Sequence, residues 1–440
     1  MAFLCVFLVL VILVFMNQSF ERFKLPNGMR VIFVPEPQNV ATTILVLVEA
    51  GSKYETKDLN GLSHFLEHMC FKGTEERPKA IDISGELDGL GAEYNAFTSQ
   101  EYTGYYVKVA ANKSEQALDI ISDLYMNPVF DATEIEKEKG VIIEELNMYE
   151  DMPHRKVHDL LMEALYGDQP AGWDIGGRKE VIKKITRDDF LKYRGEHYVA
   201  SATAIVVAGA FDSNLFKKKI EGNFEKLTKG KKVGKVATSE KQSKPIIKTQ
   251  YKKSDQTHLV IACRAFDTYD DRRFALEVLS DILGGGMSSR LFQRVREELG
   301  AAYYVRSEVN LFTDHGYLGI AAGVDHKKFS IVVSAILDEL KKLAKESVSE
   351  AELKRAKDHL VGRLMLGLET SDALATYFGG QEILKQKIVS PKDIIRHVNQ
   401  VKSSDILVIA REFFVNSKLA LSVIGPYKDS TNIAPIFRFR

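Results

Sequence analysis

The chain has 440 residues, a length that predicts two or three compact domains rather than one. Lysine and arginine together number 60, as do aspartate and glutamate, so net charge gives no reason to expect binding to nucleic acid or to an anionic surface. The three cysteines, Cys5, Cys70 and Cys263, are widely separated and odd in number, which argues against a disulfide framework and fits a reducing compartment.

The N-terminus carries an unbroken apolar run, residues 2–16, which is short for a transmembrane helix and lacks the basic region and cleavage site of a secretory signal. Either the leader, residues 1–19, is an anchor, or the start is placed too far upstream. If it inserts, the first basic residues, Arg22 and Lys24, leave the rest of the chain in the cytoplasm. The sequence therefore predicts a cytoplasmic protein, membrane-associated only through residues 2–16, and a folded part from about Phe20.

The first part of the chain alternates strand and helix patterns. Asn27-Gly28 lies between two short alternating runs and predicts a β-hairpin. A longer helix is expected to start near Thr133, with Thr133 and Glu136 forming a capping box. The other elements predicted here are a buried strand in 41–51, a helix in 61–74, two strands in 91–111 and an amphipathic helix in 114–125.

The second part repeats the pattern of the first. LGAEY (90–94) is echoed by LGAAY (299–303), and GYYVKVAA (104–111) by GYLGIAAG (316–323); an amphipathic helix follows each time. The repeat predicts an α+β protein of two homologous α/β-sandwich domains. The predicted ranges are 20–228 for the first domain, 229–247 for a lysine-rich solvated linker and 248–440 for the second domain.

A metal motif lies in the helix predicted within 61–74. His64 and His68 are one turn apart, so both imidazoles face one side, and Glu67 lies beside them. The three residues avoid the apolar stripe on the opposite side of the helix, where a core histidine would lie; that stripe consists of Leu62, Phe65, Leu66 and Met69. The arrangement H-x-x-E-H predicts a zinc site with Glu67 as general base.

A catalytic zinc site needs a third protein ligand, and the acidic helix in 133–153 is the best donor. On a helical wheel Glu138 and Glu145 flank its apolar stripe, whereas Glu144 points to solvent. Because an inward carboxylate needs a cation, Glu145 is favoured over Glu144 as the ligand. Glu138 is either a supporting carboxylate or part of a surface ion pair.

A rival histidine pair, His154 and His158, also has a four-residue spacing. No carboxylate lies between them, and Arg155 and Lys156 would repel a cation. A solvated helix face is the better interpretation of this pair.

Three segments together resemble the pitrilysin/insulinase family of zinc peptidases, in particular its bacterial and mitochondrial processing peptidase-like branch. They are HFLEHMCFKGT, EKGVIIEELNMYEDMP and GGGMSSRLFQRVREELGAAY, and the resemblance extends from Phe20 to the C-terminus. It implies Glu145 as zinc ligand and Glu138 as its support. It also implies that Arg296 and Tyr303, from an R-x₆-Y pattern, reach the tetrahedral intermediate.

The resemblance further implies that an edge strand holds an extended peptide through Asn95, Ala96 and Phe97. Gly284–Gly286 resemble the flexible loop that precedes the Arg296 helix in the family; the alternative is a plain helix terminator. GDQPAGWDIGG, residues 167–177, departs from the family's pattern, because it lacks a histidine that the resemblance implies there.

The sequence therefore predicts a metalloendopeptidase with one Zn²⁺ per chain, which cleaves unstructured peptides or presequence-like segments inside a two-domain clamshell. A homodimer is implied, because the chain holds half of the family's four-repeat chamber, and no nucleic-acid partner is expected. The alternative is a non-catalytic structural subunit of a hetero-oligomeric peptidase, against which the intact H-x-x-E-H argues.

Overall fold

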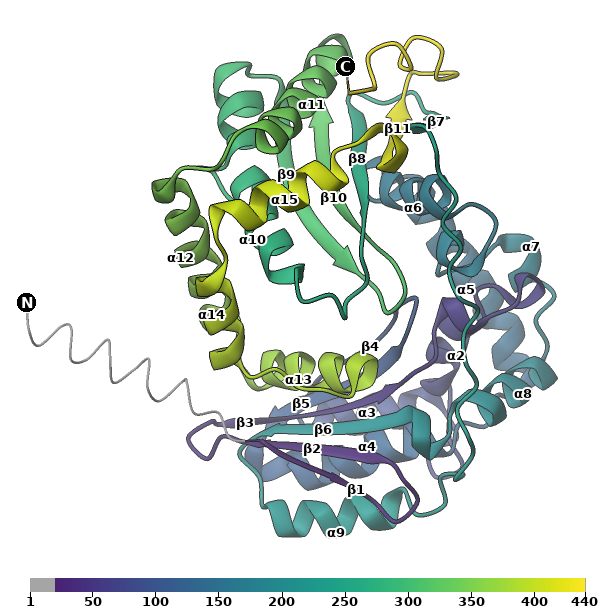
Figure 1. Ribbon diagram of the computed structural model, residues 1–440. Helices are drawn as coiled ribbons and strands as arrows, with labels where there is room; N and C mark the ends of the chain where they lie inside the picture. Colours follow the sequence, from purple (N-terminus) through teal and green to yellow (C-terminus); the bar gives the residue numbers. More distant parts are fainter. Residues whose placement is uncertain (1–19, 440) are drawn as a thin grey trace, which may run out of the picture. The chain divides into compact units, whose positions relative to one another are not determined.

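The computed structural model describes residues 20–439, which fold into two compact units (Figure 1). Unit 1 comprises the described residues up to Leu146, Asp174–Val236 and Met365–Lys392. Unit 2 comprises Asn147–Trp173, Ala237–Leu364 and the described residues from Asp393 onward. Two long helices, α5 and α12, run from one unit into the other.

The regular elements of unit 1 are β1 (Glu21–Lys24), β2 (Arg30–Pro35), β3 (Ala41–Val48), α2 (Leu62–Cys70), α3 (Ala80–Gly89), β4 (Glu93–Thr98), β5 (Thr103–Ala110), α4 (Ser114–Met126), most of α5 (Ala132–Glu150), α7 (Lys179–Ile182), α8 (Arg187–His197), β6 (Thr203–Gly209), α9 (Ser213–Asn223) and α13 (Ser371–Lys385). Those of unit 2 are α6 (Pro153–Tyr166), β7 (Ile246–Tyr251), β8 (Thr257–Ala265), α10 (Arg273–Gly284), the π-helix η6 (Phe292–Glu298), β9 (Ala302–Leu311), β10 (Gly316–Val324), α11 (Phe329–Lys345), most of α12 (Glu350–Leu366), most of α14 (Pro391–Gln400), α15 (Ser403–Phe413) and β11 (Leu419–Gly425).

The sheet of unit 1 has the strand order β1-β2-β6-β3-β5-β4. The predicted hairpin at Asn27-Gly28 is confirmed, since β1 pairs antiparallel with β2. Alternate residues of β3 face opposite sides of the sheet: Ile44 and Val46 belong to the core shared with α2 and α4, whereas Leu45 and Leu47 face α13 at Gly379. Helices therefore cover both faces, as Figure 1 shows for α13.

The sheet of unit 2, β7-β11-β8-β10-β9, repeats the five strands β2-β6-β3-β5-β4 with the same pairing directions. The pairs β2–β6 and β7–β11 are parallel, and every other pair in these five-stranded sets is antiparallel. The predicted fold class, two homologous α/β-sandwich domains, is confirmed. Unit 1 differs by the added edge strand β1.

The two repeats exchange one helix each, so the compact units depart from the predicted ranges 20–228 and 248–440. Helix α6 packs on the sheet of unit 2, where Val157 and Leu161 join a core cluster with Val260. Its counterpart α13 packs on β3 and β6 in unit 1. Hydrophobic periodicity predicts that such a helix buries one face, but not which of two similar sheets receives it.

One smaller prediction agrees with the structure in part and another is wrong. The predicted linker 229–247 has no regular structure up to residue 245 and no buried residue, but strand β7 begins at Ile246, and Glu240 and Gln242 each bind the Arg264 guanidinium at 2.7 Å. The cap of α5 is Asp131 rather than Thr133, because the Asp131 carboxylate accepts hydrogen bonds from the amides of Thr133 and Glu134.

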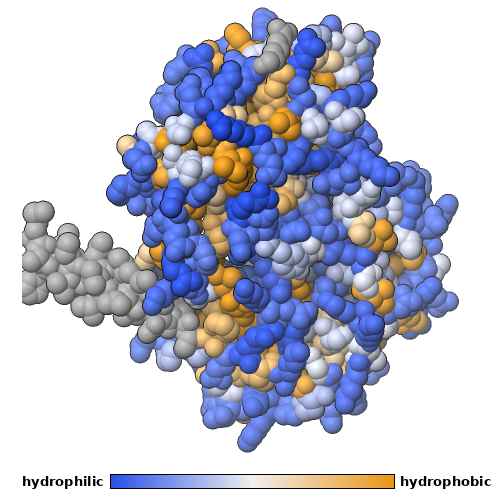
Figure 2. Space-filling view, viewed as in Figure 1, coloured by the Kyte–Doolittle hydropathy of each residue, from blue (hydrophilic) through white to orange (hydrophobic). Residues whose placement is uncertain are grey.

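The expected membrane association is also corrected. Among residues 20–439 no helix is long and apolar enough to cross a bilayer. The leader, residues 1–19, to which the anchor was assigned, lies outside the described residues, so the predicted localisation loses its support. On the face drawn in Figure 2, hydrophilic residues predominate over the described part of the chain.

Candidate metal centre

The start of α2 is fixed by a buried carboxylate. Gly61 precedes the helix in the left-handed region, at φ 102°, where a Cβ would lie 2.7 Å from the Gly176 carbonyl oxygen. The Glu55 carboxylate accepts hydrogen bonds from the amides of Gly61, at 2.8 Å, and Ser63, at 2.7 Å. Burial raises the pKa of Glu55 to about 7, although these bonds oppose the shift. The helix thus begins at a set position and orientation.

The predicted apolar stripe of α2 is confirmed, since Leu62, Phe65, Leu66 and Met69 are all fully buried. Burial of side chains of this size contributes about 1.5–3 kcal/mol each to folding. This face fixes the rotation of the helix, so His64 and His68 emerge on the side away from the core. Their side chains are 14% and 21% exposed, which leaves the imidazoles within reach of solvent.

Helix α5 brings Glu145 to the two histidines. The Nε2 atoms of His64 and His68 are 3.3 Å apart, and Glu145 Oε2 lies 3.6 Å from the first and 3.5 Å from the second. Glu144, which the helical wheel disfavoured as the third ligand, is exposed. Among residues 20–439, this is the single group of three or more histidine, cysteine, aspartate or glutamate side chains whose potential ligand atoms converge this closely.

The donor set fits zinc. Nitrogen and oxygen ligands about 2.0–2.2 Å from a tetrahedral zinc lie about 3.3–3.5 Å from one another. The three separations found here, 3.3, 3.5 and 3.6 Å, agree with that geometry. Two neutral imidazoles and one carboxylate also form a donor set that zinc accepts.

Glu138 orients the His68 ring through a contact with its Nδ1 atom. The Glu138 carboxylate lies 2.9 Å from His68 Nδ1 and 2.6 Å from Lys72 Nζ. Burial would raise the pKa of Glu138, but the bonds to His68 and Lys72 outweigh it and lower the pKa. A hydrogen bond at Nδ1 fixes the tautomer that presents Nε2 toward Glu145. Of the two interpretations of Glu138, the supporting carboxylate therefore matches the geometry better than a surface ion pair.

Glu67 lies between the histidine side of α2 and the sheet. Its side chain is buried, and its Oε2 accepts a hydrogen bond of 2.5 Å from the Thr98 hydroxyl at the end of β4. Burial raises the pKa of the Glu67 carboxyl, while the bond from Thr98 and the neighbouring His68 lower it. Glu67 is not part of the converging donor set.

The predicted substrate strand is β4, the last strand of the sheet. The Ala96 amide donates to the Asn95 side-chain oxygen at 2.9 Å and therefore points away from β5. Because orientation alternates along an antiparallel pair, the backbone groups of Asn95 and Phe97 face β5 instead. The Phe97 ring lies across Gly104, where a Cβ would approach it to 2.3 Å.

Arg296 and Tyr303 belong to unit 2, and both lie at irregularities of the backbone. Arg296 is on the π-helix η6, exposed, and packs its guanidinium over the Phe292 ring at 4.9 Å. Tyr303 lies where the pairing of β9 with β10 shifts register, and the residue is 76% exposed. Such bulges re-aim side chains and are frequent at functional sites.

The rival pair His154 and His158 does not form a donor group. His154 instead lies near the His258 ring, with centroids 6.1 Å apart, and His158 Nδ1 lies 3.4 Å from Glu308. Burial lowers the pKa of His158. His154 is exposed, as a solvated helix face requires, whereas His158 is half-buried beside Glu308.

Three residues of the centre were missed by sequence reasoning: Glu55, Thr98 and Lys72. Lys72 lies four residues after His68. This spacing could have indicated that both side chains bind one carboxylate, which is that of Glu138. No local pattern marks Glu55 or Thr98, because each acts on α2 from another element.

Comparison with known proteins decides the family. Residues 30–178 match Insulinase (Peptidase family M16), and residues 184–360 match the Peptidase M16 inactive domain. The chain belongs to peptidase family M16. The resemblance to the pitrilysin/insulinase family is thereby confirmed.

Relatives within M16 cover nearly the whole chain. The uncharacterized zinc protease YmxG of Bacillus subtilis is 36% identical over 408 residues, 92% of this chain and 98% of the relative. An uncharacterized zinc protease of Streptomyces coelicolor is 33% identical over 415 residues, 93% of this chain and 90% of the relative. A protease of Helicobacter pylori has the same fold, with a TM-score of 0.86 at 21% identity over 93% of this chain and 100% of that one.

Proposed function

We propose that this M16 chain is a zinc-dependent endopeptidase that cleaves unstructured peptides or presequence-like segments. The observation that carries the proposal is the convergence of His64 Nε2, His68 Nε2 and Glu145 Oε2 at separations suited to zinc. The names of the relatives, zinc proteases, support it. The predicted homodimer and the absence of a nucleic-acid partner stay predictions.

A zinc ion held by these three side chains would supply Lewis-acid chemistry, which makes a water more acidic and polarises a carbonyl. Glu67 accepts the proton of the attacking water and later delivers it to the leaving amine. The bond from Thr98 holds the Glu67 carboxylate in place for both transfers. Glu138 keeps the proton on Nδ1 of His68, so the lone pair of Nε2 stays available to bind the metal.

The experiment that tests the function is cleavage of a quenched peptide library by the purified chain. Cleavage should stop when a chelator removes the metal, and it should return when zinc is restored. Cleavage that continues unchanged in zinc-free protein would contradict the proposal. A non-catalytic subunit, the alternative, would cleave no peptide even when fully loaded with zinc.

We further propose that β4 binds substrate by strand addition through the outward backbone of Ala96. The substitution Ala96→Pro removes the backbone N–H of residue 96, which points away from β5. No hydrogen bond to β5 is lost, so the sheet should persist. The KM for long peptides should rise about fivefold, the value of one hydrogen bond. Asn95→Ala, the matched control, frees the Ala96 amide and should not raise KM. Equal KM values for wild type and Ala96→Pro would contradict strand addition.

We also propose that Arg296 and Tyr303 stabilise the transition state as hydrogen-bond donors. Tyr303→Phe removes a hydroxyl from an exposed side chain, so folding and zinc content should survive. Turnover should fall about a hundredfold, as for other oxyanion donors, with little change in KM. Tyr269→Phe, which removes a hydroxyl from another exposed tyrosine of unit 2, is the control. Wild-type kcat in Tyr303→Phe on several unrelated peptides would exclude the role.

A further inference from the structure

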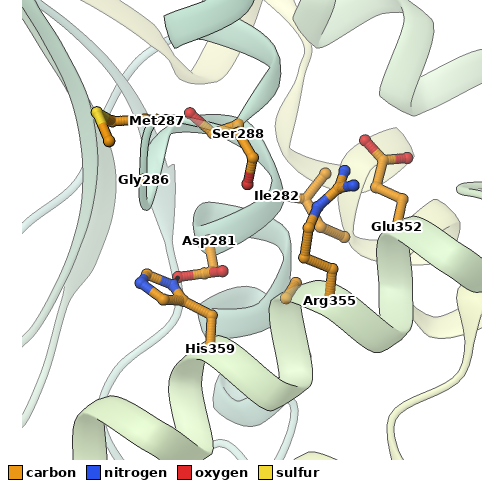
Figure 3. A pocket seen from close by; sticks show the side chains of 10 residues that line it. Asp281, Ile282, Gly286, Met287, Ser288, Glu352, Arg355 and His359 are labelled. Atoms are coloured by element: carbon orange, nitrogen blue, oxygen red, sulfur yellow. Dashed lines mark hydrogen bonds and ion pairs between the residues drawn. The ribbon is translucent and has the colours of Figure 1, made fainter.

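A pocket of about 340 Å³ opens within unit 2, between α10, α12 and the glycine loop, residues 285–289 (Figure 3). Its volume is within the range of about 300–1,000 Å³ typical of small-molecule sites. None of its lining residues belongs to the metal centre. The proposed peptidase function assigns no role to it.

Two basic side chains of α12 line the pocket from one helix face. Arg355 and His359 are one turn apart; Figure 3 shows the His359 ring beside Asp281 and the Arg355 guanidinium between Ile282 and Glu352. Within residues 20–439 the Arg355 guanidinium forms no hydrogen bond or ion pair. The His359 Nδ1 lies 2.7 Å from Asp281 Oδ1, an arrangement that fixes the ring and leaves Nε2 as its second polar atom.

The acidic side chains that line the pocket already have hydrogen-bond partners. Glu352 accepts two hydrogen bonds from Arg290, at 2.7 and 2.8 Å. Asp281 is engaged with His359. Arg355 therefore contributes a guanidinium that no carboxylate of the pocket binds.

The glycine loop adds a buried hydroxyl and open space. Ser289 is 5% exposed, yet its Oγ has no hydrogen-bond partner, although buried hydroxyls are normally bonded. At Gly286 a Cβ would come within 3.5 Å of His359 Cε1 and 3.8 Å of Nε2, so any larger side chain there would fill the space beside the imidazole.

We propose that this pocket binds an oxyanion, the phosphate or carboxylate group of a small molecule. Arg355 is the bidentate partner, since a guanidinium matches the geometry of two oxygens. His359 Nε2 and the Ser289 hydroxyl, which can rotate toward the ligand, are the further donors. Of the predicted flexible loop Gly284–Gly286, Gly286 thus lines a binding site, whereas Gly284 is the last residue of α10.

Calorimetric titration of the full chain with inorganic phosphate, and separately with succinate, tests the proposal. At least one should bind at a single site, and the tighter ligand identifies the group as phosphoryl or carboxylate. Arg355→Gln should weaken binding about tenfold or more, the usual value of a charged hydrogen-bond partner. Gly286→Val, which keeps every charge, should also abolish binding by filling the space.

Lys354→Gln is the matched control, because it removes a positive charge from the same helix at an exposed side chain paired with Asp358. Its binding should equal that of wild type. Glu145→Gln should also bind normally, which separates this site from the metal centre. Failure of both anions to bind, or equal weakening by Lys354→Gln and Arg355→Gln, would overturn the proposal.

Discussion

Glu67→Gln should reduce peptide cleavage about 10²–10⁴-fold, the range for loss of a general base, while leaving about one zinc per chain. Glutamine has the same shape as glutamate, and its amide oxygen can still accept the bond from the Thr98 hydroxyl. It cannot accept the proton of the attacking water. The expected result is therefore a folded, zinc-loaded and inactive protein, checked by metal analysis and peptide kinetics on the same preparation.

The metal content decides how the result is interpreted. Loss of zinc together with activity would make Glu67 a ligand and would contradict its exclusion from the donor set. Substantial remaining activity would assign the proton transfer to another group. Glu144→Gln, an exposed substitution of the same kind, should leave both zinc and activity unchanged.

Glu145→Gln should remove most of the zinc, and with it the activity. Glu145 provides the one carboxylate oxygen that lies 3.5 and 3.6 Å from the two imidazoles, and the neutral amide oxygen of glutamine binds the metal more weakly. Substitution of a supporting residue typically costs about 10–100-fold in metal affinity, so a direct ligand should cost more. Zinc dissociation constants from competition with a chelator are the measurement.

The adjacent pair Glu144 and Glu145 provides its own control. Both substitutions alter one carboxylate of α5 by the same chemical change, but only Glu145 lies near the histidines. Glu138→Gln should have an intermediate effect, since it weakens the support of His68 without removing a ligand. Greater zinc loss in Glu144→Gln than in Glu145→Gln would contradict the geometry.

Sequence patterns predicted much of the fold because these elements carry strong local periodicity. The stripe of α2, the Asn27-Gly28 hairpin and the internal repeat all appear in the structure as expected. The exchange of α6 and α13 was not predictable, because the two sheets offer similar apolar faces. The true cap, Asp131, was missed because Thr133 and Glu136 fit a capping box equally well.

At the candidate site, the spacing of His64 and His68 and the helical wheel of α5 were enough to bring three donors together. The contributions of Glu55 and Thr98 depend on tertiary contacts, which spacing does not encode. The π-helix at Arg296 and the bulge at Tyr303 were equally invisible in sequence, since both arise from backbone pairing rather than composition.

X-ray absorption at the zinc edge of the purified protein identifies the atoms that bind the metal. We expect one zinc with two imidazole nitrogens and carboxylate or water oxygens at about 2.0–2.2 Å, and no sulfur ligand. The cysteines described here, Cys70 and Cys263, are buried and take no part in the donor set. A sulfur shell at about 2.3 Å, a single imidazole, or a protein purified without zinc that does not bind it on addition would exclude the site of His64, His68 and Glu145.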